Sequence, residues 1–379
     1  MKWSATPDLT PTRRLMLTAL AVTVTVWIVI AWRQGDISHT LGDTDDAMRI
    51  VMVRDLLHGR GWWDQLVMRL QPPQGVYMHW SRLLDGALAA CVWLASRLVS
   101  PAAAEYAVRF AWPLAWILPA VIAALSIARS LGGRLAVFVC AILLLTNVVL
   151  YIQFRPGRVD HHNIQIVMAA VACACAMATD HRARFAVLAG VASGLGLAIG
   201  IEALAFHAII GASFALRAAI EPEEAEPARA YGLALPVASL TFFCIQTPPW
   251  RWGLPFCDSL GANLIVAIVI VGLGLALFAS VSAKLPLVFR LVALAALGAI
   301  AAGAYLAFDP GCIHGPFASV DPRLRPIWFN WISELQPWPR LWRMHRDSAL
   351  ISIAMAVMGA CAAALLLASQ GRRPAPATV

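Results

Sequence analysis

The chain has 379 residues, of which 60% are hydrophobic and only 13% charged, and its mean hydropathy is +0.72. A soluble domain has roughly one-quarter charged residues, so this composition excludes a soluble protein and indicates a polytopic membrane protein. The formal net charge of +8 comes from basic residues that lie largely in loops and at the ends of apolar segments. Basic residues at such places orient a membrane chain, so nucleic acid is not an expected partner.

Apolar segments along the chain predict about ten membrane-spanning helices in a window of about 19 residues. They are 15–33, 105–128, 134–152, 163–179, 184–200, 201–217, 230–248, 262–281, 290–308 and 347–369. The first follows basic residues, but it is long enough to span and lacks a small-residue cleavage site, so we expect an uncleaved first helix. The sequence therefore predicts an all-α membrane domain over residues 1–369 and a disordered cytoplasmic tail over 370–379.

One further apolar segment, 83–99, is too short to span comfortably and contains Asp85 and Arg97. If it lies on the membrane surface, the short basic loops all fall on the side of the N-terminus, as cytoplasmic loops should. We therefore predict an interfacial helix over 83–99. With this topology the loops 34–82, 153–162, 249–261 and 309–346 lie outside the cytoplasm.

Acidic and imidazole side chains recur where these apolar segments end, and the topology places them all on the external side. The group consists of Asp45, Asp46, His79, Asp160, His161, His162 and Glu334. Such groups are costly to desolvate at the edge of a bilayer, so their convergence predicts a metal or a reacting centre. Carboxylate and imidazole donors suit Mg²⁺, Mn²⁺ or Zn²⁺.

Structural interpretations of the same residues stay open at this point. Asp160 could cap the helix that begins near Ile164, and Asp43, Asp45 and Asp46 could form a solvated turn that caps a helix starting at Ala47. We expect His161 to point away from the cluster and do not count it as a ligand. Two further side chains, Arg82 and Glu202, are candidates to face the same site.

The order of these motifs resembles the membrane part of the catalytic subunit of oligosaccharyltransferase, a glycosyltransferase of the GT-C superfamily, in its archaeal or bacterial form. The matching stretches are Asp45, Arg54-Asp55, Pro72 to Trp80 in PPQGVYMHW, Gly157 to His162 in GRVDHH, and Trp331 to Pro337 in WISELQP. The resemblance covers residues 15–369 and rests mainly on the motifs.

This resemblance implies an inverting, metal-dependent transfer of a sugar or oligosaccharide from a polyprenyl-phosphate or -diphosphate carrier to an extracytoplasmic acceptor. It implies that Asp45, His79, Asp160 and His162 bind the divalent cation, expected to be Mn²⁺ or Mg²⁺ with Zn²⁺ as an alternative. Asp45 and Glu334 would be the catalytic carboxylates, and the spacing to Arg54 and His79 favours Asp45 over Asp46. The expected location is a bacterial inner membrane with the active site on the periplasmic face.

The sequence departs from the family in three respects. The soluble domain with its Trp-Trp-Asp-Tyr-Gly motif has no counterpart here, Trp331 replaces a small or hydroxyl residue, and Gln165 stands where an acidic residue often occurs. The acceptor therefore stays open among a glycan, a lipid and a protein, and a partner subunit could complete the enzyme. A transporter, a metal-handling membrane protein and a non-catalytic GT-C-like partner subunit are the alternatives.

Three further sets of residues lie outside this cluster. Arg340, Arg343 and Arg346 in loop 309–346 are candidates for binding the donor phosphates or lipid headgroups. Cys257 and Cys312 both lie in external loops, where a disulfide is chemically permitted. The acidic stretch from Glu221 to Pro227 is expected to be a cytoplasmic linker.

Overall fold

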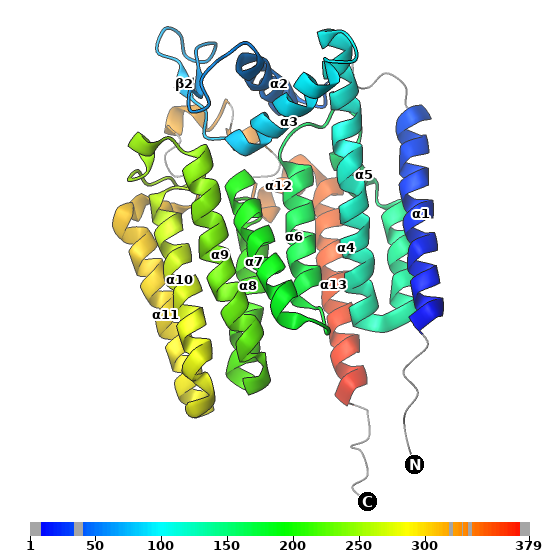
Figure 1. Ribbon diagram of the computed structural model, residues 1–379, viewed down its shortest axis with the longest axis vertical. Helices are drawn as coiled ribbons and strands as arrows, with labels where there is room; N and C mark the ends of the chain where they lie inside the picture. Colours follow the sequence, from blue (N-terminus) through cyan, green and yellow to red (C-terminus); the bar gives the residue numbers. More distant parts are fainter. Residues whose placement is uncertain (1–8, 34–40, 318–320, 328, 333–335, 372–379) are drawn as a thin grey trace, which may run out of the picture. The chain divides into compact units, whose positions relative to one another are not determined.

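In the computed structural model the chain forms two compact units, residues 1–316 and 317–379. The structure describes residues 9–33, 41–317, 321–327, 329–332 and 336–371. The first unit is a bundle of long helices with two shorter helices and a small hairpin lying across one end (Figure 1). The predicted all-α class is confirmed, with one two-stranded hairpin added to it.

The first unit contains eleven of the helices in the described residues. They are α1 (Leu9–Arg33), α2 (Thr44–Leu57), α3 (Arg82–Ala95), α4 (Pro101–Thr146), α5 (Val148–Phe154), α6 (His162–Ala176), α7 (Arg182–Ile199), α8 (Leu204–Ile220), α9 (Ala225–Gln246), α10 (Ala262–Val281) and α11 (Leu287–Phe308). Short 3-10 turns occupy Pro222–Glu224, Pro249–Arg251, Ser282–Lys284 and Pro310–His314. The hairpin pairs β1 (Leu66–Val67) with β2 (Val76–Tyr77) in antiparallel register.

Six helices of the described part are long and apolar enough to cross a membrane. They are Pro11–Arg33, Pro101–Thr146, Arg182–Ile199, Pro222–Gln246, Ala262–Lys284 and Leu287–Phe308. Three shorter apolar helices, His162–Ala176, Leu204–Ile220 and Ala349–Gly359, fall where further spans are predicted. The chain is thus an integral membrane protein, and the number of ten spans stays a prediction.

The long helix α4 contains the predicted span 105–128 and most of the span 134–152, which continues into α5, and a sharp reversal separates the two. At 1.5 Å per residue, 46 continuous helical residues would extend about 69 Å, more than twice the ~30 Å hydrocarbon core. The backbone leaves the helical conformation at Gly132 and Gly133, and Gly133 has φ of 61°. Only glycine adopts this conformation at little cost, so the chain turns here and returns beside itself (Figure 1).

Small residues let the helices of the bundle approach closely. A Cβ atom at Gly190 or Gly194 of α7 would come within 3.0 Å of the backbone of α9. Gly232 of α9 and Gly272 of α10 face each other in the same way, because a Cβ at either would lie 2.7 Å from the carbonyl oxygen of the other. Apolar side chains gain little by leaving lipid for one another, so close backbone packing of this kind holds membrane helices together.

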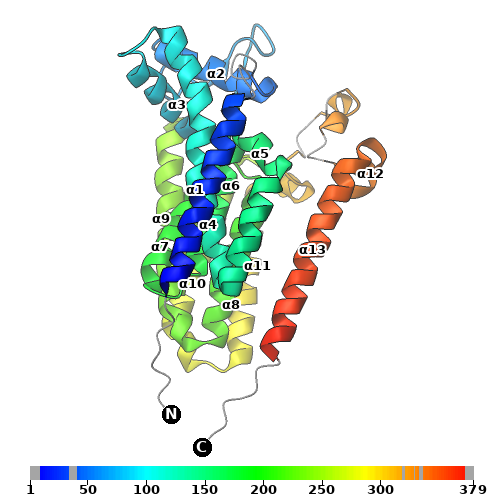
Figure 2. The ribbon, with the colours of Figure 1, turned by 90° about the vertical axis from the view of Figure 1, so that its right-hand side faces the viewer.

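Helix α1 packs along α4, as Figure 2 shows. Its Trp27 is 1% exposed and lies edge-on to Tyr151 at 5.8 Å and near Phe154 at 5.9 Å. These contacts fix the first span against the segment that leads into the 155–160 loop. The orientation of that loop therefore depends on the packing of α1.

Helices α2 and α3 lie across the end of the bundle (Figures 1 and 2). A buried ion-pair cluster joins the two helices. Arg49 Nη1 lies 2.6 Å from Asp85 Oδ1, and Arg82 Nη1 lies 3.3 Å from Asp85 Oδ2, with all three side chains at most 1% exposed. Arg82 also donates to the carbonyl oxygens of Gly61, Trp62 and Asp64. The side chain of Arg82 therefore holds the loop 61–64 and Asp85.

The predicted linker at 221–227 is wrong. Residues 222–224 form a 3-10 turn and α9 begins at Ala225, five residues before the predicted span. Glu224 is 3% exposed and forms an ion pair with Arg182, while Arg217 Nη1 lies 3.9 Å from it. This buried carboxylate ties the α6–α7 connection to the start of α9, which the composition of the stretch did not indicate.

The second unit contains α12 (Trp338–Met344) and α13 (Arg346–Gly371), with 3-10 turns at Pro322–Leu324 and Phe329–Trp331. Gln336 fastens the loop before α12, because its side chain donates to the carbonyl oxygens of Phe329 and Ile332 at 2.8 and 3.0 Å. The helix α13 includes 370 and 371, the first two residues of the predicted tail. Residues 372–379 lie outside the described residues.

Candidate functional site

The site begins at the first turn of α2, in the sequence GDTDDAMR. Asp43 is the N-cap of this helix, and its Oδ1 accepts hydrogen bonds from the backbone N–H groups of Asp45 and Asp46 at 3.0 and 3.1 Å. The capping interpretation is therefore correct for Asp43. The cap directs the next two carboxylates differently: Asp45 is half-buried, whereas Asp46 is fully buried.

Asp46 anchors the loop that precedes α6. Its Oδ1 accepts hydrogen bonds from the backbone N–H groups of Val159 and Asp160 at 2.8 and 2.9 Å, and Oδ2 accepts one from Arg158 Nη1 at 2.9 Å. Arg158 also forms an ion pair with Asp43. Burial raises the pKa of Asp46 to about 6, although the guanidinium of Arg158 and the backbone donors oppose the shift. These bonds join the loop after α1 to the loop before α6.

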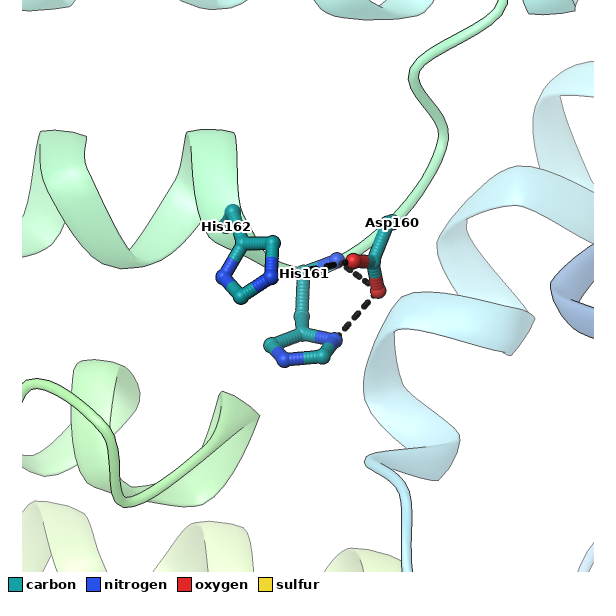
Figure 3. A group of neighbouring side chains, drawn as sticks. All are labelled: Asp160, His161 and His162. Carbon is teal, nitrogen blue, oxygen red and sulfur yellow. Dashed lines mark hydrogen bonds and ion pairs between the residues drawn. The ribbon is translucent and has the colours of Figure 1, made fainter. Parts of the chain in front are cut away.

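Three consecutive residues, Asp160, His161 and His162, form the centre of the site where that loop enters α6 (Figure 3). Asp160 is 2% exposed, and its Oδ1 accepts the backbone N–H of His161 at 2.6 Å and contacts His161 Nδ1. Its Oδ2 has no hydrogen-bond partner among the described residues and lies 3.4 Å from His162 Nε2. Burial opposes ionisation, but the hydrogen bond of His161, both imidazoles and Arg49 hold the pKa of Asp160 well below its usual range.

His161 bridges two carboxylates, so the expectation that it points away from the cluster is wrong. Its Nδ1 contacts Asp160, and its Nε2 lies 3.3 Å from Glu202 Oε1. Burial disfavours the imidazolium, yet the hydrogen bonds and charges of the two carboxylates raise the pKa of His161 to about 9. Gln165, the departure from the family pattern, donates to the other oxygen of Glu202. His161, rather than Asp160, is the N-cap residue of α6.

Asp45 lies within the electrostatic reach of this centre. Burial, followed by the charges of Asp160 and Asp43, raises the pKa of Asp45, while the imidazoles of His161 and His162 oppose the shift. Its carboxyl group takes no part in the hydrogen bonds that Asp46 makes to the loop. Asp45 is therefore the carboxylate of α2 that stays available to a ligand at the centre.

His79 reaches the same region from the loop after β2. Its ring is exposed and lies edge-on to Trp80, with centroids 6.5 Å apart, and Trp80 lies 6.1 Å from His161. His79, His161 and Glu202 line one pocket, which also includes Tyr77 and Arg251. The loop after β2 thus brings His79 to the pocket that His161 also lines.

The donor set at the centre fits a divalent cation. Ligand atoms of Asp160, His161 and His162 lie within 4.8 Å of one another. Two donors about 2.1 Å from one ion at a tetrahedral angle stand about 3.4 Å apart, which matches the separation of Asp160 Oδ2 from His162 Nε2. Asp160 Oδ2 is also a buried oxygen with no hydrogen-bond partner among the described residues. A carboxylate and imidazole set suits Zn²⁺ or Mn²⁺.

A second candidate metal group, Cys257, Asp309 and Cys312, is not a metal site, because the two cysteines form a disulfide. The sequence left the pairing of Cys257 with Cys312 open, and the structure contains this disulfide. The disulfide links the loop before α10 to the turn after α11. It lies next to residues 256 and 258–260, which line the pocket of His79 and Arg251.

Four predicted site residues fall, by their sequence position, within the second unit, residues 317–379. Arg340, Arg343 and Arg346 lie in the second unit, on or directly after α12. Glu334 lies outside the described residues. The assignment of these four residues stays a prediction.

Three residues that the sequence analysis did not select contribute to the region: Arg49, Arg158 and Arg251. Each had a local signal in the sequence. Arg158 directly precedes the Asp-His-His motif, Arg49 lies one turn after Asp45 and Asp46 on the same helix, and Arg251 stands between two tryptophans in the loop 249–261. The predicted topology places all three outside the cytoplasm, where basic residues are depleted, and this is a reason to look for a partner or ligand of each.

Comparison with known proteins identifies the fold. No protein-family model matches the chain, and no curated protein does. Three solved structures of the oligosaccharyltransferase of Archaeoglobus fulgidus match it at 13–14% identity: the apo form with TM-score 0.57, a complex with an inhibitory peptide and a dolichol-phosphate with TM-score 0.61, and a complex with Zn and sulfate with TM-score 0.60. The matches cover 85%, 85% and 91% of this chain.

The same matches cover 39%, 41% and 46% of the solved chains, so this chain spans less than half the length of the proteins that it resembles. Identity this low establishes the fold alone. The chain thus has the fold of the membrane part of an archaeal oligosaccharyltransferase, and the resemblance inferred from the motifs is confirmed at that level.

Proposed function

We propose that this protein is a GT-C-type membrane glycosyltransferase that moves a sugar or oligosaccharide from a polyprenyl-phosphate or -diphosphate carrier to an extracytoplasmic acceptor. The observation that carries the proposal is the convergence of Asp45, Asp160 and His162 at one end of a bundle with the oligosaccharyltransferase fold. One solved structure of the same fold is a complex with an inhibitory peptide and a dolichol-phosphate, which supports a polyprenyl-linked donor.

In this proposal Asp160 and His162 hold a divalent cation, with Asp45 and His79 as further ligands. A bound cation would stabilise the negative charge that develops on the leaving phosphate. Mn²⁺ and Mg²⁺ remain the expected ions, and Zn²⁺ gains support from the solved complex with Zn. The buried, low-pKa carboxylate of Asp160 stays ionised at neutral pH, as a metal ligand must.

Asp45 also has the position and the freedom for the acceptor-side role. Its carboxylate is half-buried and is not used to hold the loop, so it can orient an acceptor hydroxyl or amide and accept its proton. The raised pKa of Asp45 favours proton uptake more than an exposed aspartate would. Asp46 holds the loop instead, because both of its carboxylate oxygens accept hydrogen bonds from residues 158–160.

The test is sugar release from a polyprenyl-diphosphate-linked, radiolabelled donor by purified full-length protein in the presence of Mn²⁺. Asp45→Asn and His162→Ala are expected to lower turnover by a factor of roughly a hundred or more. The matched control is Asp55→Asn, which changes an aspartate of the same helix that pairs with Arg60 at 3.4 Å. Unchanged turnover in Asp45→Asn and His162→Ala, with folded protein, would refute the proposal.

A further inference from the structure

We infer that Arg251 is the oxyanion-binding residue of the pocket beside the Asp160–His162 centre, and that the ligand of this pocket carries a phosphate or carboxylate group. This inference rests on the proposed function for its connection to a reacting sugar, but the binding itself does not require turnover.

The guanidinium of Arg251 is held between two aromatic rings. Its central carbon lies 3.9 Å from the ring centroid of Tyr77 and 4.8 Å from that of Phe256. Rings that cover the faces of a guanidinium leave its N–H donors, which point outward in the plane, free to bind a ligand. Among the described residues, no hydrogen bond or ion pair joins the guanidinium of Arg251 to another side chain.

The hydroxyl of Tyr77 and the backbone of Phe256 are held by contacts with the surrounding structure. The hydroxyl of Tyr77 lies 3.2 Å from Gln65 Oε1 and 3.3 Å from the carbonyl oxygen of Trp63. The backbone N–H of Phe256 donates to Asn263 Oδ1 at 3.1 Å, and Asn263 Nδ2 donates back to the carbonyl oxygen of Phe256 at 2.9 Å. Asn263 is fully buried.

The loop of Phe256 is held a second time by the disulfide between Cys257 and Cys312. Arg251 is thereby placed before any ligand binds, and little conformational entropy remains to be lost on binding. Such preorganisation of an arginine without an acidic partner is a feature of an anion site and has no evident role in packing.

The pocket places Arg251 together with the side chains of the centre. It is lined by His79, His161 and Glu202 as well as by Tyr77, Arg251 and Phe256. Glu202 is already bound to His161 and Gln165. Asp258 lines the pocket too, with its Oδ1 accepting from the hydroxyl of Ser259 at 3.3 Å, and no ion pair joins it to Arg251 within the described chain.

Carboxylates and cations in one small pocket favour a ligand that is anionic at one point and neutral and hydroxylated elsewhere. A sugar bearing an oxyanion meets this description. The oxyanion could be the diphosphate through which a donor sugar is attached, or the carboxylate of an acidic acceptor sugar. Both offer paired oxygens to the forked donors of an arginine.

The experiment measures equilibrium binding of inorganic pyrophosphate, D-glucuronate and D-glucose to the purified full-length protein in EDTA, by isothermal titration calorimetry. EDTA removes any cation at Asp160 and His162, so anion binding through a metal does not contribute. We expect wild-type protein to bind one of the two anions, and Arg251→Gln to weaken that binding by roughly tenfold or more. Arg251→Lys, which keeps the charge but loses the fork, is expected to fall between them.

The matched control is Arg97→Gln, because the central carbon of Arg97 lies 4.3 Å from the ring centroid of Trp93, outside the pocket. Binding of pyrophosphate alone that depends on Arg251 assigns the pocket to the donor, and binding of glucuronate alone assigns it to an acidic sugar. Anion binding equal in Arg251→Gln and wild type, or no binding of either anion, would overturn the inference. Absence of sugar transfer by wild-type protein that nevertheless binds an anion through Arg251 would count against the proposed function only.

Discussion

The carboxylate of Asp46 accepts a hydrogen bond of 2.9 Å from the backbone N–H of Asp160, a residue 114 positions further along the chain. A second bond from Val159 and an ion pair with Arg158 complete the attachment. Asp46 therefore positions the loop that presents the Asp-His-His motif. Its neighbour Asp45 keeps its carboxylate available, so adjacent aspartates have separable roles that mutagenesis can distinguish.

The first prediction concerns these two aspartates. Asp46→Asn removes the fully buried carboxylate that holds the backbone of Val159 and Asp160. Arg158 keeps Asp43 and Asp160 as acidic partners, so we expect a loss of about 2 kcal/mol in stability. Asp45→Asn should change stability by less than about 1 kcal/mol, because its carboxylate does not hold the fold. Thermal unfolding of the two variants in the same detergent measures the difference. Equal melting temperatures would contradict the division of roles.

The second prediction concerns metal binding. After treatment with EDTA and desalting, Mn²⁺ titrated into the protein and followed by electron paramagnetic resonance should bind one site. Asp160→Asn and His162→Ala remove donors that lie 3.4 Å apart, and each should weaken Mn²⁺ at least roughly tenfold. His58→Ala, which changes the exposed C-cap histidine of α2, serves as the control. Undiminished binding in both site variants would exclude this centre as the metal site.

The third prediction compares two arginines of α2. Arg49 and Asp85 are both fully buried at 2.6 Å, so Arg49→Met leaves a buried carboxylate short of a partner and should cost about 3–5 kcal/mol. Arg54 binds Glu105 at a similar 2.7 Å, but its side chain is 54% exposed, so Arg54→Met should cost about 1 kcal/mol or less. Chemical denaturation of both variants tests the contrast. Similar losses would show that burial does not set the cost here.

The fourth prediction concerns the disulfide. Unfolding without reductant should expose six alkylatable thiols and unfolding with reductant eight, because Cys257 and Cys312 are paired. The bond joins residues 55 positions apart, so in the chain-entropy model the Cys257→Ser/Cys312→Ser double variant should lose about 4 kcal/mol. Mass spectrometry after alkylation gives the count. Eight labelled thiols without reductant would contradict the pairing.

Much of the fold follows from local hydrophobicity. The predicted span 15–33 ends where α1 ends, and 262–281 coincides with α10, because uninterrupted apolar runs flanked by polar residues leave little choice in a bilayer. The start of α9 at Ala225 was missed because Glu224 is neutralised by Arg182 from another loop. A hydropathy window treats every charged residue as exposed to solvent. Glu224 is instead buried, because it is paired with a residue that is distant in the sequence.

For the candidate site, motif order was informative about which loops meet, and less so about which atoms meet. Asp45, Asp160 and His162 were selected because acidic and imidazole groups are expensive at helix ends unless they bind something, and the structure brings their segments together. His161 was misjudged, because its ring contacts Glu202, whose position depends on the packing of α7 and α8. The pocket around Arg251 was not predicted, because the stacking partners Tyr77 and Phe256 and the disulfide that holds Phe256 come from segments far apart in the sequence.

Composition and hydropathy alone therefore suffice to identify a helical membrane protein and the loops that carry its polar groups, because the bilayer penalises every charged residue in its interior by a similar large amount. The hydrogen bonds of Asp46 to residues 158–160, the bridge made by His161, and the stacking of Arg251 arise in three dimensions. They depend on contacts of a few ångströms between residues separated by up to 174 positions, from Tyr77 to Arg251, and such contacts leave no periodic trace in the sequence.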